Sequence, residues 1–105
     1  MEPTAPAQSF SDLIRGEKPV VVDFTATWCG PCKAMVPIIN AVKQRVGDKA
    51  VVLKVDVDRN PATAKAYAIQ SVPTLMIFRN GRAVWRASGV ISATQLEEVL
   101  KPFLL

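Results

Sequence analysis

Cys29 and Cys32 are the only cysteines in the chain, and two residues separate them. An apolar run precedes the pair and a helical pattern begins at Cys32. Residues three apart on a helical turn lie on one face, which is close enough for a disulfide. A helix N-terminus also offers unpaired amides and a positive partial charge. Both favour the thiolate, the species that attacks a disulfide, so the pattern indicates a redox pair.

Two other roles for the cysteine pair are less consistent with the sequence. A structural zinc site needs four ligands, usually cysteine or histidine. With two cysteines and no histidine, carboxylates or a second chain would have to complete it. A purely structural disulfide between near neighbours would close a very short loop and remove little chain entropy.

Composition predicts one ordinary globular domain, since the chain has 105 residues, half of them hydrophobic. We expect a loose arm at residues 1–8, which contain Pro3 and Pro6, and a single domain at residues 9–105. No run of about 18 apolar residues occurs. The first ten residues lack the pattern of a signal peptide, so we expect a cytoplasmic protein.

The net charge of +4 indicates a mildly basic surface. Arg79, Arg82 and Arg86 cluster around one predicted hairpin. Nucleic-acid binding would require more basic residues on one face, with aromatic residues among them. An attraction to acidic protein partners fits better, and it would act mainly on the association rate.

The elements that position the cysteines follow from hydrophobic periodicity. Ser9 and Gly16 are expected to cap the first helix, and Gly47 the second. Helices are predicted at 9–15, 32–46 and 60–67 and after Ser92, and strands at 20–24, 51–57, 75–78 and 83–87. This order predicts an α/β fold. Its central sheet has helices on both faces and is parallel first and antiparallel at the hairpin.

Several local signals refine these elements. Asn80-Gly81 is a hairpin turn, because both residues tolerate positive φ. Ser92 and Gln95 form a capping box for the last helix. Prolines inside helices remove a backbone hydrogen bond, so Pro37 should kink its helix and Pro102 should loosen the last one. Trp85 is expected to pack on the sheet.

The run Trp28-Cys29-Gly30-Pro31-Cys32-Lys33 resembles the active-site motif of the thioredoxin family. The likeness begins near Phe10 and covers nearly the whole chain. It includes Val22-Asp23-Phe24, Pro37, Asp56-Val57-Asp58, Val72-Pro73-Thr74, Asn80-Gly81 and Gly89. Several separated motifs in the right order are more specific than one.

The resemblance implies a thioredoxin fold and a protein-disulfide reductase that works by dithiol–disulfide exchange. Cys29 would be the nucleophile and Cys32 the resolving cysteine, and no cofactor would be bound besides this redox-active disulfide. The implied partners are disulfide-containing target proteins and an NADPH-dependent, flavin-containing thioredoxin reductase. The resemblance also implies a role in electron transport and cell redox homeostasis, and we expect a monomer that binds neither nucleic acid nor membrane.

Two charged residues match catalytic positions of the family. Asp23 lies in an apolar strand, where burial would be expensive and would raise its pKa. The resemblance implies that it accepts a proton from Cys32; the alternative is a carboxylate at a frayed strand end. Lys54 matches a lysine near that aspartate. Its alternation with Leu53 and Val55 is equally consistent with a solvated side chain.

The resemblance further implies a cis peptide bond before Pro73 and backbone pairing of Val72 with a bound target. A trans turn, a buried core position for Trp28 and a simple turn role for Gly89 are the alternatives. The implied target-binding surface consists of Trp28, Gly30, Pro31, Val72, Pro73, Gly89 and Val90.

The sequence departs from the family in three respects. Thr25 stands where many bacterial members have tryptophan, the first strand of the family is expected to be missing or short, and the chain is more basic. Two alternative functions are also consistent with the sequence: a thioredoxin-fold binding module with incidental cysteines, and an oxidase or isomerase. Loss of both thiols would separate the first of these from a reductase, and the reduction potential would separate the second.

Overall fold

The structure is a computed structural model that describes residues 9–104, so the expected arm at 1–8 lies outside the described residues. The described chain forms a four-stranded sheet in the order β2-β1-β3-β4. The strands are β1 (Val20–Thr25), β2 (Val51–Asp56), β3 (Thr74–Arg79) and β4 (Arg82–Ser88). Strand β2 is parallel to β1, as predicted, whereas β3 is antiparallel to both β1 and β4. Within residues 9–104, no strand precedes Val20.

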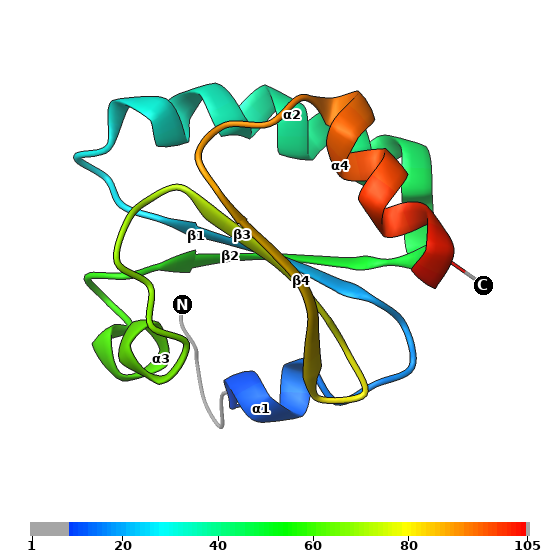
Figure 1. Cartoon of the computed structure of the whole chain (residues 1–105), viewed down its shortest axis with the longest axis horizontal. Helices are drawn as coiled ribbons and strands as arrows, with labels where there is room; N and C mark the ends of the chain where they lie inside the picture. The colour runs from blue at the N-terminus through cyan, green and yellow to red at the C-terminus, as the bar shows by residue number, and fades with distance from the viewer. Residues whose placement is uncertain (1–8, 105) are drawn as a thin grey trace.

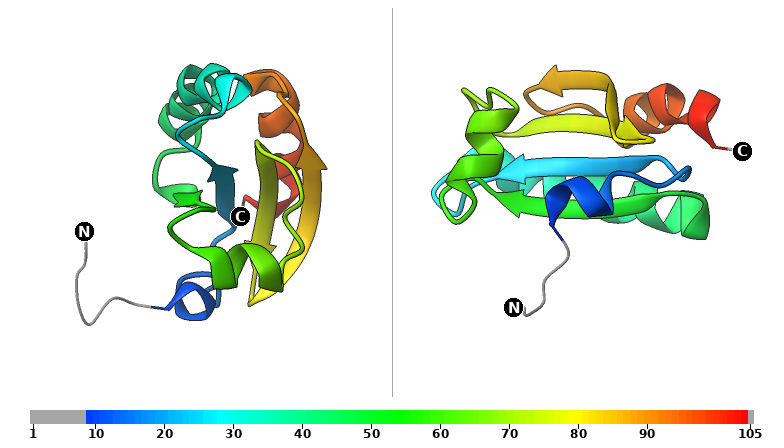
Figure 2. Two further views of the ribbon diagram at one scale, coloured as in Figure 1. Left: turned by 90° about the vertical axis from the view of Figure 1, so that its left-hand side faces the viewer. Right: turned by 90° about the horizontal axis from the view of Figure 1, so that it is seen from below.

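Helices cover both faces of this sheet (Figure 1). Helices α2 (Gly30–Val46) and α4 (Ala93–Leu100) lie on one face, and α1 (Phe10–Leu13) and α3 (Pro61–Ala66) on the other. Figure 2 shows the same layers from the side and places β2 and β4 at opposite edges of the sheet. Short 3₁₀ turns at Gly47–Lys49 and Lys101–Phe103 follow α2 and α4.

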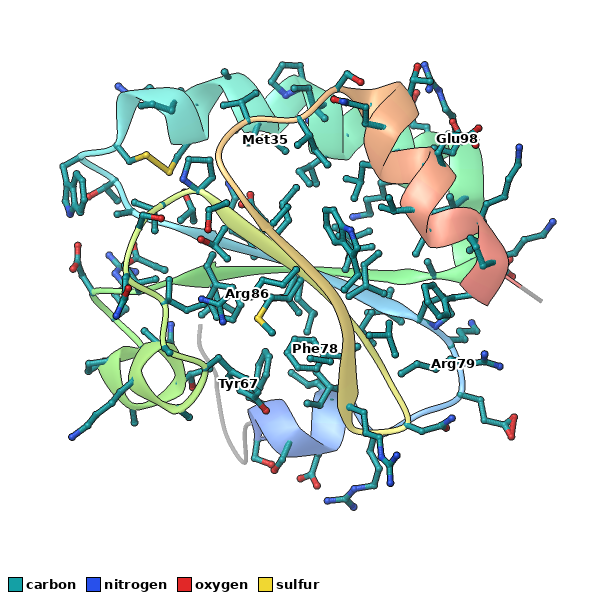
Figure 3. All side chains as sticks on the ribbon, in the orientation of Figure 1. Met35, Tyr67, Phe78, Arg79, Arg86 and Glu98 are labelled. Carbon is teal, nitrogen blue, oxygen red and sulfur yellow. A yellow bond between two sulfur atoms is a disulfide. The ribbon has the colours of Figure 1, made fainter. Side chains whose placement is uncertain are left out.

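The core has two main layers because side chains alternate along the central strands. Val21, Leu75 and Ile77 pack against α2 and α4 and share a cluster with Met35 of α2, and Trp85 packs on this layer as predicted. The other layer contains an aromatic cluster. The ring centroids of Tyr67 and Phe78 are 5.1 Å apart, and Phe10 packs on both (Figure 3).

Most local predictions are confirmed. Asn80 and Gly81 have φ values of 54° and 80° and form the hairpin turn. Gly47 ends α2 with φ of 57°, and the capping box of Ser92 and Gln95 is present. The last helix gives way to a 3₁₀ turn that contains Pro102, which is the predicted loosening.

The first helix is shorter than predicted. Ser9 caps it, but it ends at Leu13, and Ile14 rather than Gly16 is the C-cap. The carbonyls of Ile14 and Gly16 accept hydrogen bonds from Gly81 and Asn80, both at 2.9 Å. The chain therefore leaves the helix early, because these carbonyls bind the β3–β4 hairpin, a contact that local sequence does not encode.

Two helices have starts that differ from prediction in detail. Helix α2 begins at Gly30 rather than Cys32, with Cys29 as its N-cap. Helix α3 begins at Pro61, within the predicted range 60–67, and the side chain of its N-cap residue, Asn60, makes no capping hydrogen bond. The amide Nδ2 of Asn60 instead donates to the Asp56 carbonyl at 3.0 Å, which ties the helix start to the end of β2.

Candidate functional site

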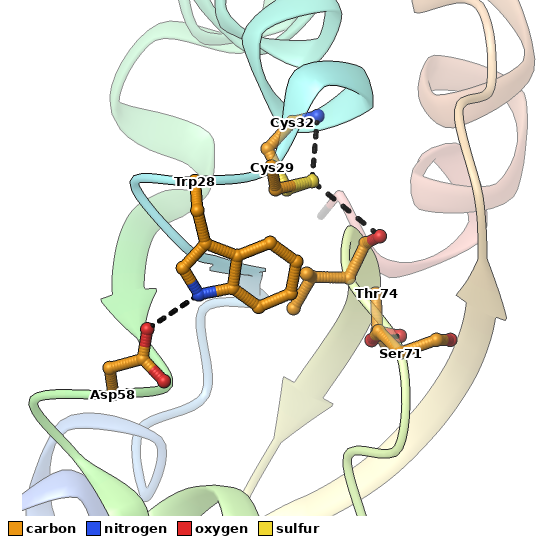
Figure 4. The surroundings of a disulfide bond; sticks show 7 residues. Trp28, Cys29, Cys32, Asp58, Ser71 and Thr74 are labelled. Atoms are coloured by element: carbon orange, nitrogen blue, oxygen red, sulfur yellow. Dashed lines mark hydrogen bonds between the residues drawn. A yellow bond between two sulfur atoms is a disulfide. The ribbon is translucent and has the colours of Figure 1, made fainter.

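The two cysteines lie where β1 ends and α2 begins. Their sulfur atoms form a disulfide, with the Cα atoms 5.3 Å apart. Cys29 is the N-cap residue of α2, and its Sγ accepts a hydrogen bond from the Cys32 backbone N–H at 3.1 Å (Figure 4). Both residues are nearly buried, with 3% and 4% of their surface exposed. The helix start therefore directs an amide donor at the sulfur of Cys29.

The loop before β3 lies against the outer side of the disulfide. The peptide bond between Val72 and Pro73 is cis, so the trans alternative is wrong. The Val72 carbonyl oxygen lies 3.6 Å from Cys29 Sγ, within reach of a thiol donor in the reduced protein. Gly89 has φ of 93°, a conformation that favours glycine, and its N–H donates to the Pro73 carbonyl at 2.9 Å.

Trp28 is a surface residue, with 70% of its area exposed, so the core alternative is wrong. Its indole Nε1 donates to Asp58 Oδ2 at 2.8 Å, which holds the ring beside the disulfide (Figure 4). Sequence reasoning gave Asp58 no role of its own, because nothing local links it to a residue thirty positions earlier.

A shallow, exposed surface surrounds Cys29. Gly30 and Pro31 are exposed at the start of α2, and Val90 is 46% exposed after Gly89. A small cleft of about 90 Å³ continues this surface away from the disulfide. It is lined by Trp28, Val57, Ile69, Gln70, Ser71 and Val72. The predicted target-binding residues therefore gather on one side of the cysteine pair.

Asp23 lies on the inner side of the site. It is 2% exposed and sits in the middle of β1, so the frayed-end alternative is wrong. Its Oδ1 has no hydrogen-bond partner among the described residues. Burial raises the pKa of this carboxyl above its usual value, and the nearby positive charge of Lys54 offsets part of the rise. Asp23 shares its strand face with Val21, which packs against α2.

Lys54 occupies the β2 position that pairs with Asp23 in register. Both interpretations of the sequence are confirmed in part, because the residue is exposed and still acts on the pKa of Asp23. It lines a cleft of about 290 Å³ that opens beside Cys32 and Thr25. Lys54 is therefore on the inner side of the disulfide, away from the target-binding residues.

Within residues 9–104, no cluster of three or more histidine, cysteine, aspartate or glutamate side chains could hold a metal ion. No helix in this described part of the chain is long and apolar enough to cross a membrane.

Comparisons with known proteins agree with this site. A family model described as thioredoxin matches residues 3–102. Among curated proteins, the chain is 44% identical over 97 residues to "Thioredoxin Y, chloroplastic" of Oryza sativa subsp. japonica, of which it spans only 58%. It is 45% identical over 97 residues to "Thioredoxin-like protein slr0233" of Synechocystis sp., with 91% of this chain and 92% of that protein covered.

A bacterial relative and a solved structure agree with these matches. The chain is 43% identical over 96 residues to the "Thioredoxin" of Alicyclobacillus acidocaldarius, with 91% of each protein covered. The structure of a mutant thioredoxin from Halobacterium salinarum NRC-1 superposes with a TM-score of 0.83 at 32% identity. That match covers 94% of this chain and 87% of the other.

Proposed function

Because the chain belongs to the thioredoxin family, we propose that it is a protein-disulfide reductase whose oxidised form is reduced again by a thioredoxin reductase. Thiol–disulfide oxidoreduction is the chemistry of this family and of the Cys29–Cys32 pair in this chain. The observation that carries the proposal is the disulfide at the N-terminus of α2, with an exposed surface on one side and a buried carboxyl on the other.

In the first step, Cys29 acts as the nucleophile. Its thiolate attacks one sulfur of the target disulfide, and a bond forms between Cys29 and that sulfur. The bond between the two target sulfurs breaks, and the second sulfur leaves as a thiolate that takes up a proton. The Cys32 N–H at 3.1 Å supports this step, because it stabilises negative charge on Cys29 Sγ before the attack.

In the second step, Cys32 resolves the mixed disulfide. Its thiolate attacks Cys29 Sγ, the bond between Cys29 and the target breaks, and the target is released as a dithiol. Two electrons have then passed to the target. Asp23 is the proposed acceptor for the proton that Cys32 must lose, since burial raises its pKa toward the range of a general base.

Target binding is proposed for the exposed surface around Cys29. An extended target segment would pair with the backbone of Val72, as in strand addition. Its side chains would rest on Trp28, Gly30, Pro31, Gly89 and Val90, which are at least partly exposed, whereas Pro73 is buried beneath this surface. Support comes from the position of the Val72 carbonyl, 3.6 Å from the attacking sulfur.

Dithiothreitol-driven reduction of insulin tests the activity. The wild-type protein should accelerate the reduction. Cys29→Ser should abolish the acceleration, because the nucleophile is lost. Cys32→Ser should form a mixed disulfide with insulin that persists, since no residue remains to resolve it. Substantial turnover by Cys29→Ser would contradict the mechanism.

Two alternatives give different results in the same series. A binding module would show no acceleration and would keep its binding after loss of both thiols. An oxidase or isomerase would show a reduction potential well above that of the glutathione pool. The reduction potential of a reductase should instead lie below that of the glutathione pool.

The partner and the compartment are further parts of the proposal. Electrons would come from NADPH through a thioredoxin reductase, which is testable as NADPH consumption with such an enzyme and insulin. We propose a reducing compartment, the cytoplasm, because both cysteines of the chain are in the redox pair and none remains for a structural disulfide. Cell fractionation tests that location, and sedimentation tests the proposed monomer.

A further inference from the structure

Besides the residues at the start of α2, two separate loops contribute to the proposed target-binding surface. One precedes β3 and contains Ser71, Val72 and Pro73; the other follows β4 and begins at Gly89. The hydrogen bond from Gly89 N–H to the Pro73 carbonyl, at 2.9 Å, joins them at one point. The neighbouring residue of each loop makes a second connection, because Thr74 at the start of β3 pairs in register with Ser88 at the end of β4.

This second connection consists of hydroxyl groups. Thr74 Oγ1 lies 2.8 Å from the Ser71 carbonyl oxygen and 3.0 Å from Ser88 Oγ. A carbonyl oxygen only accepts, so the single hydroxyl hydrogen of Thr74 goes to Ser71. Ser88 must therefore donate its own hydrogen to Thr74. The result is a directional relay from Ser88 through Thr74 to Ser71, in which each hydrogen bond polarises the next.

The relay lies beside the reacting atoms without contacting them. Thr74 is fully buried, whereas Ser88 and Ser71 are on the surface. Figure 4 shows Ser71 and Thr74 close to each other, on the side of the disulfide away from α2. The residue between Ser71 and Pro73 is Val72, whose carbonyl faces Cys29. A shift of Ser71 would move the backbone with which a target is proposed to pair.

We propose that Ser88 and Thr74 are positioning residues that hold the two target-binding loops at a fixed spacing and so set the affinity for polypeptide disulfides. This inference rests on the proposed reductase function. A polypeptide target must contact both loops while its disulfide reaches Cys29. A small aromatic disulfide needs access to Cys29 alone. The relay therefore matters for the first kind of substrate and is dispensable for the second.

The test compares insulin with a small aromatic disulfide that releases a coloured thiolate. Ser88→Ala removes the donor at an exposed position, and Thr74→Val removes the central hydroxyl with little change in volume. Thr74→Ser keeps the hydroxyl and is the conservative rescue. Thr94→Val, at an exposed site on α4, is the matched control for loss of a threonine hydroxyl. Unfolding in urea monitors the stability of each variant.

Ser88→Ala and Thr74→Val should each raise KM for insulin roughly 2- to 10-fold, the effect expected for loss of one hydrogen bond. The kcat for insulin and the rate with the small disulfide should not change. Thr74→Ser and Thr94→Val should behave as wild type. The double variant should be no worse than Thr74→Val alone, because both changes interrupt one relay.

Other results overturn the proposal. An unchanged KM for insulin in Ser88→Ala and Thr74→Val would show that the relay does not position the loops. Equal losses on both substrates, or losses that add in the double variant, would also exclude it. Failure of the wild-type protein to reduce insulin is a different outcome, because it would remove the proposed function itself.

Discussion

Strands β1 and β2 are parallel neighbours with similar sequences and very different surroundings. The first reads Val-Val-Val-Asp-Phe-Thr and the second Val-Val-Leu-Lys-Val-Asp, aligned residue for residue. Five of the six residues of β1 are buried, and none of β2 is. The difference arises because β1 lies between two strands, whereas β2 is at the edge of the sheet (Figure 2).

The two charged residues at the same register position show what this difference does. Asp23 is buried at the centre, and its surroundings raise its pKa. Lys54 is at the edge, where water solvates its charge. One apolar run therefore holds a buried carboxyl with a raised pKa, and the other holds an exposed lysine. Edge strands also tend to carry lysine, which discourages pairing with other chains.

Identical substitutions in the two strands should give the largest contrast. Val20 and Val51 pair in register and are 1% and 36% exposed. Val20→Ala should lower the free energy of unfolding by about 2 kcal/mol, through lost burial and a cavity. Val51→Ala should lower it by less than about 1 kcal/mol. Urea unfolding of both variants measures the contrast, and equal losses would mean that β2 is covered in solution.

The Asp23→Asn substitution should show the effect of burial in β1 as a change in how stability depends on pH. The pKa of Asp23 is raised in the folded state, so the folded protein binds its proton more tightly than the unfolded chain does. The stabilisation that Asp23 contributes is therefore fully present below its usual pKa of 3.8. It is lost as the pH rises through the pKa of Asp23 in the folded protein. Above that value the carboxylate is charged, buried and unpaired.

The variant removes this penalty, so at neutral pH it should be more stable than wild type by about 1 to 3 kcal/mol. The difference should shrink as the pH falls. Urea midpoints between about pH 3 and pH 8 measure it. A wild-type protein that gains stability over the variant with rising pH would contradict the assigned sign. The variant should also resolve mixed disulfides more slowly, because the proposed proton acceptor is gone.

Lys54→Met should have the smallest effect. Its positive charge lowers the pKa of Asp23, so its removal should raise that pKa further. The change in unfolding free energy should stay within about 0.5 kcal/mol, because the charge is exposed and screened. NMR titration of the Asp23 carboxyl carbon measures the pKa. The difference in the Asp23 pKa between Lys54→Met and wild type should decrease in high salt, and a difference that does not depend on salt would indicate a structural change instead.

Local chemistry explains which predictions from the sequence are confirmed. Turn residues, caps and periodicity act over a few positions, so Asn80, Gly47 and the Ser92 capping box could be assigned directly. The cysteine pair at a helix start is equally local. The cis peptide bond at Pro73 and the raised pKa of Asp23 also agree with prediction, the former on resemblance alone.

Other features required the tertiary structure. The early end of α1 depends on hydrogen bonds to the distant β3–β4 hairpin, and Trp28 depends on Asp58. Similarly, no local pattern joins Ser88 to Thr74, which are brought together only by the register of β3 and β4. These contacts link residues fourteen or more positions apart, and register is a property of two strands rather than one.

The sequence by itself determined that this chain has a redox-type cysteine pair at the start of a helix, with strands and turns in the order of an α/β fold. These are consequences of backbone geometry and hydrogen bonding between near neighbours in the chain. The tertiary structure decided which valine-rich run is central, which charge is buried and which loops meet at Cys29. Burial and pKa depend on the elements that pack around a residue, and these come from distant parts of the chain.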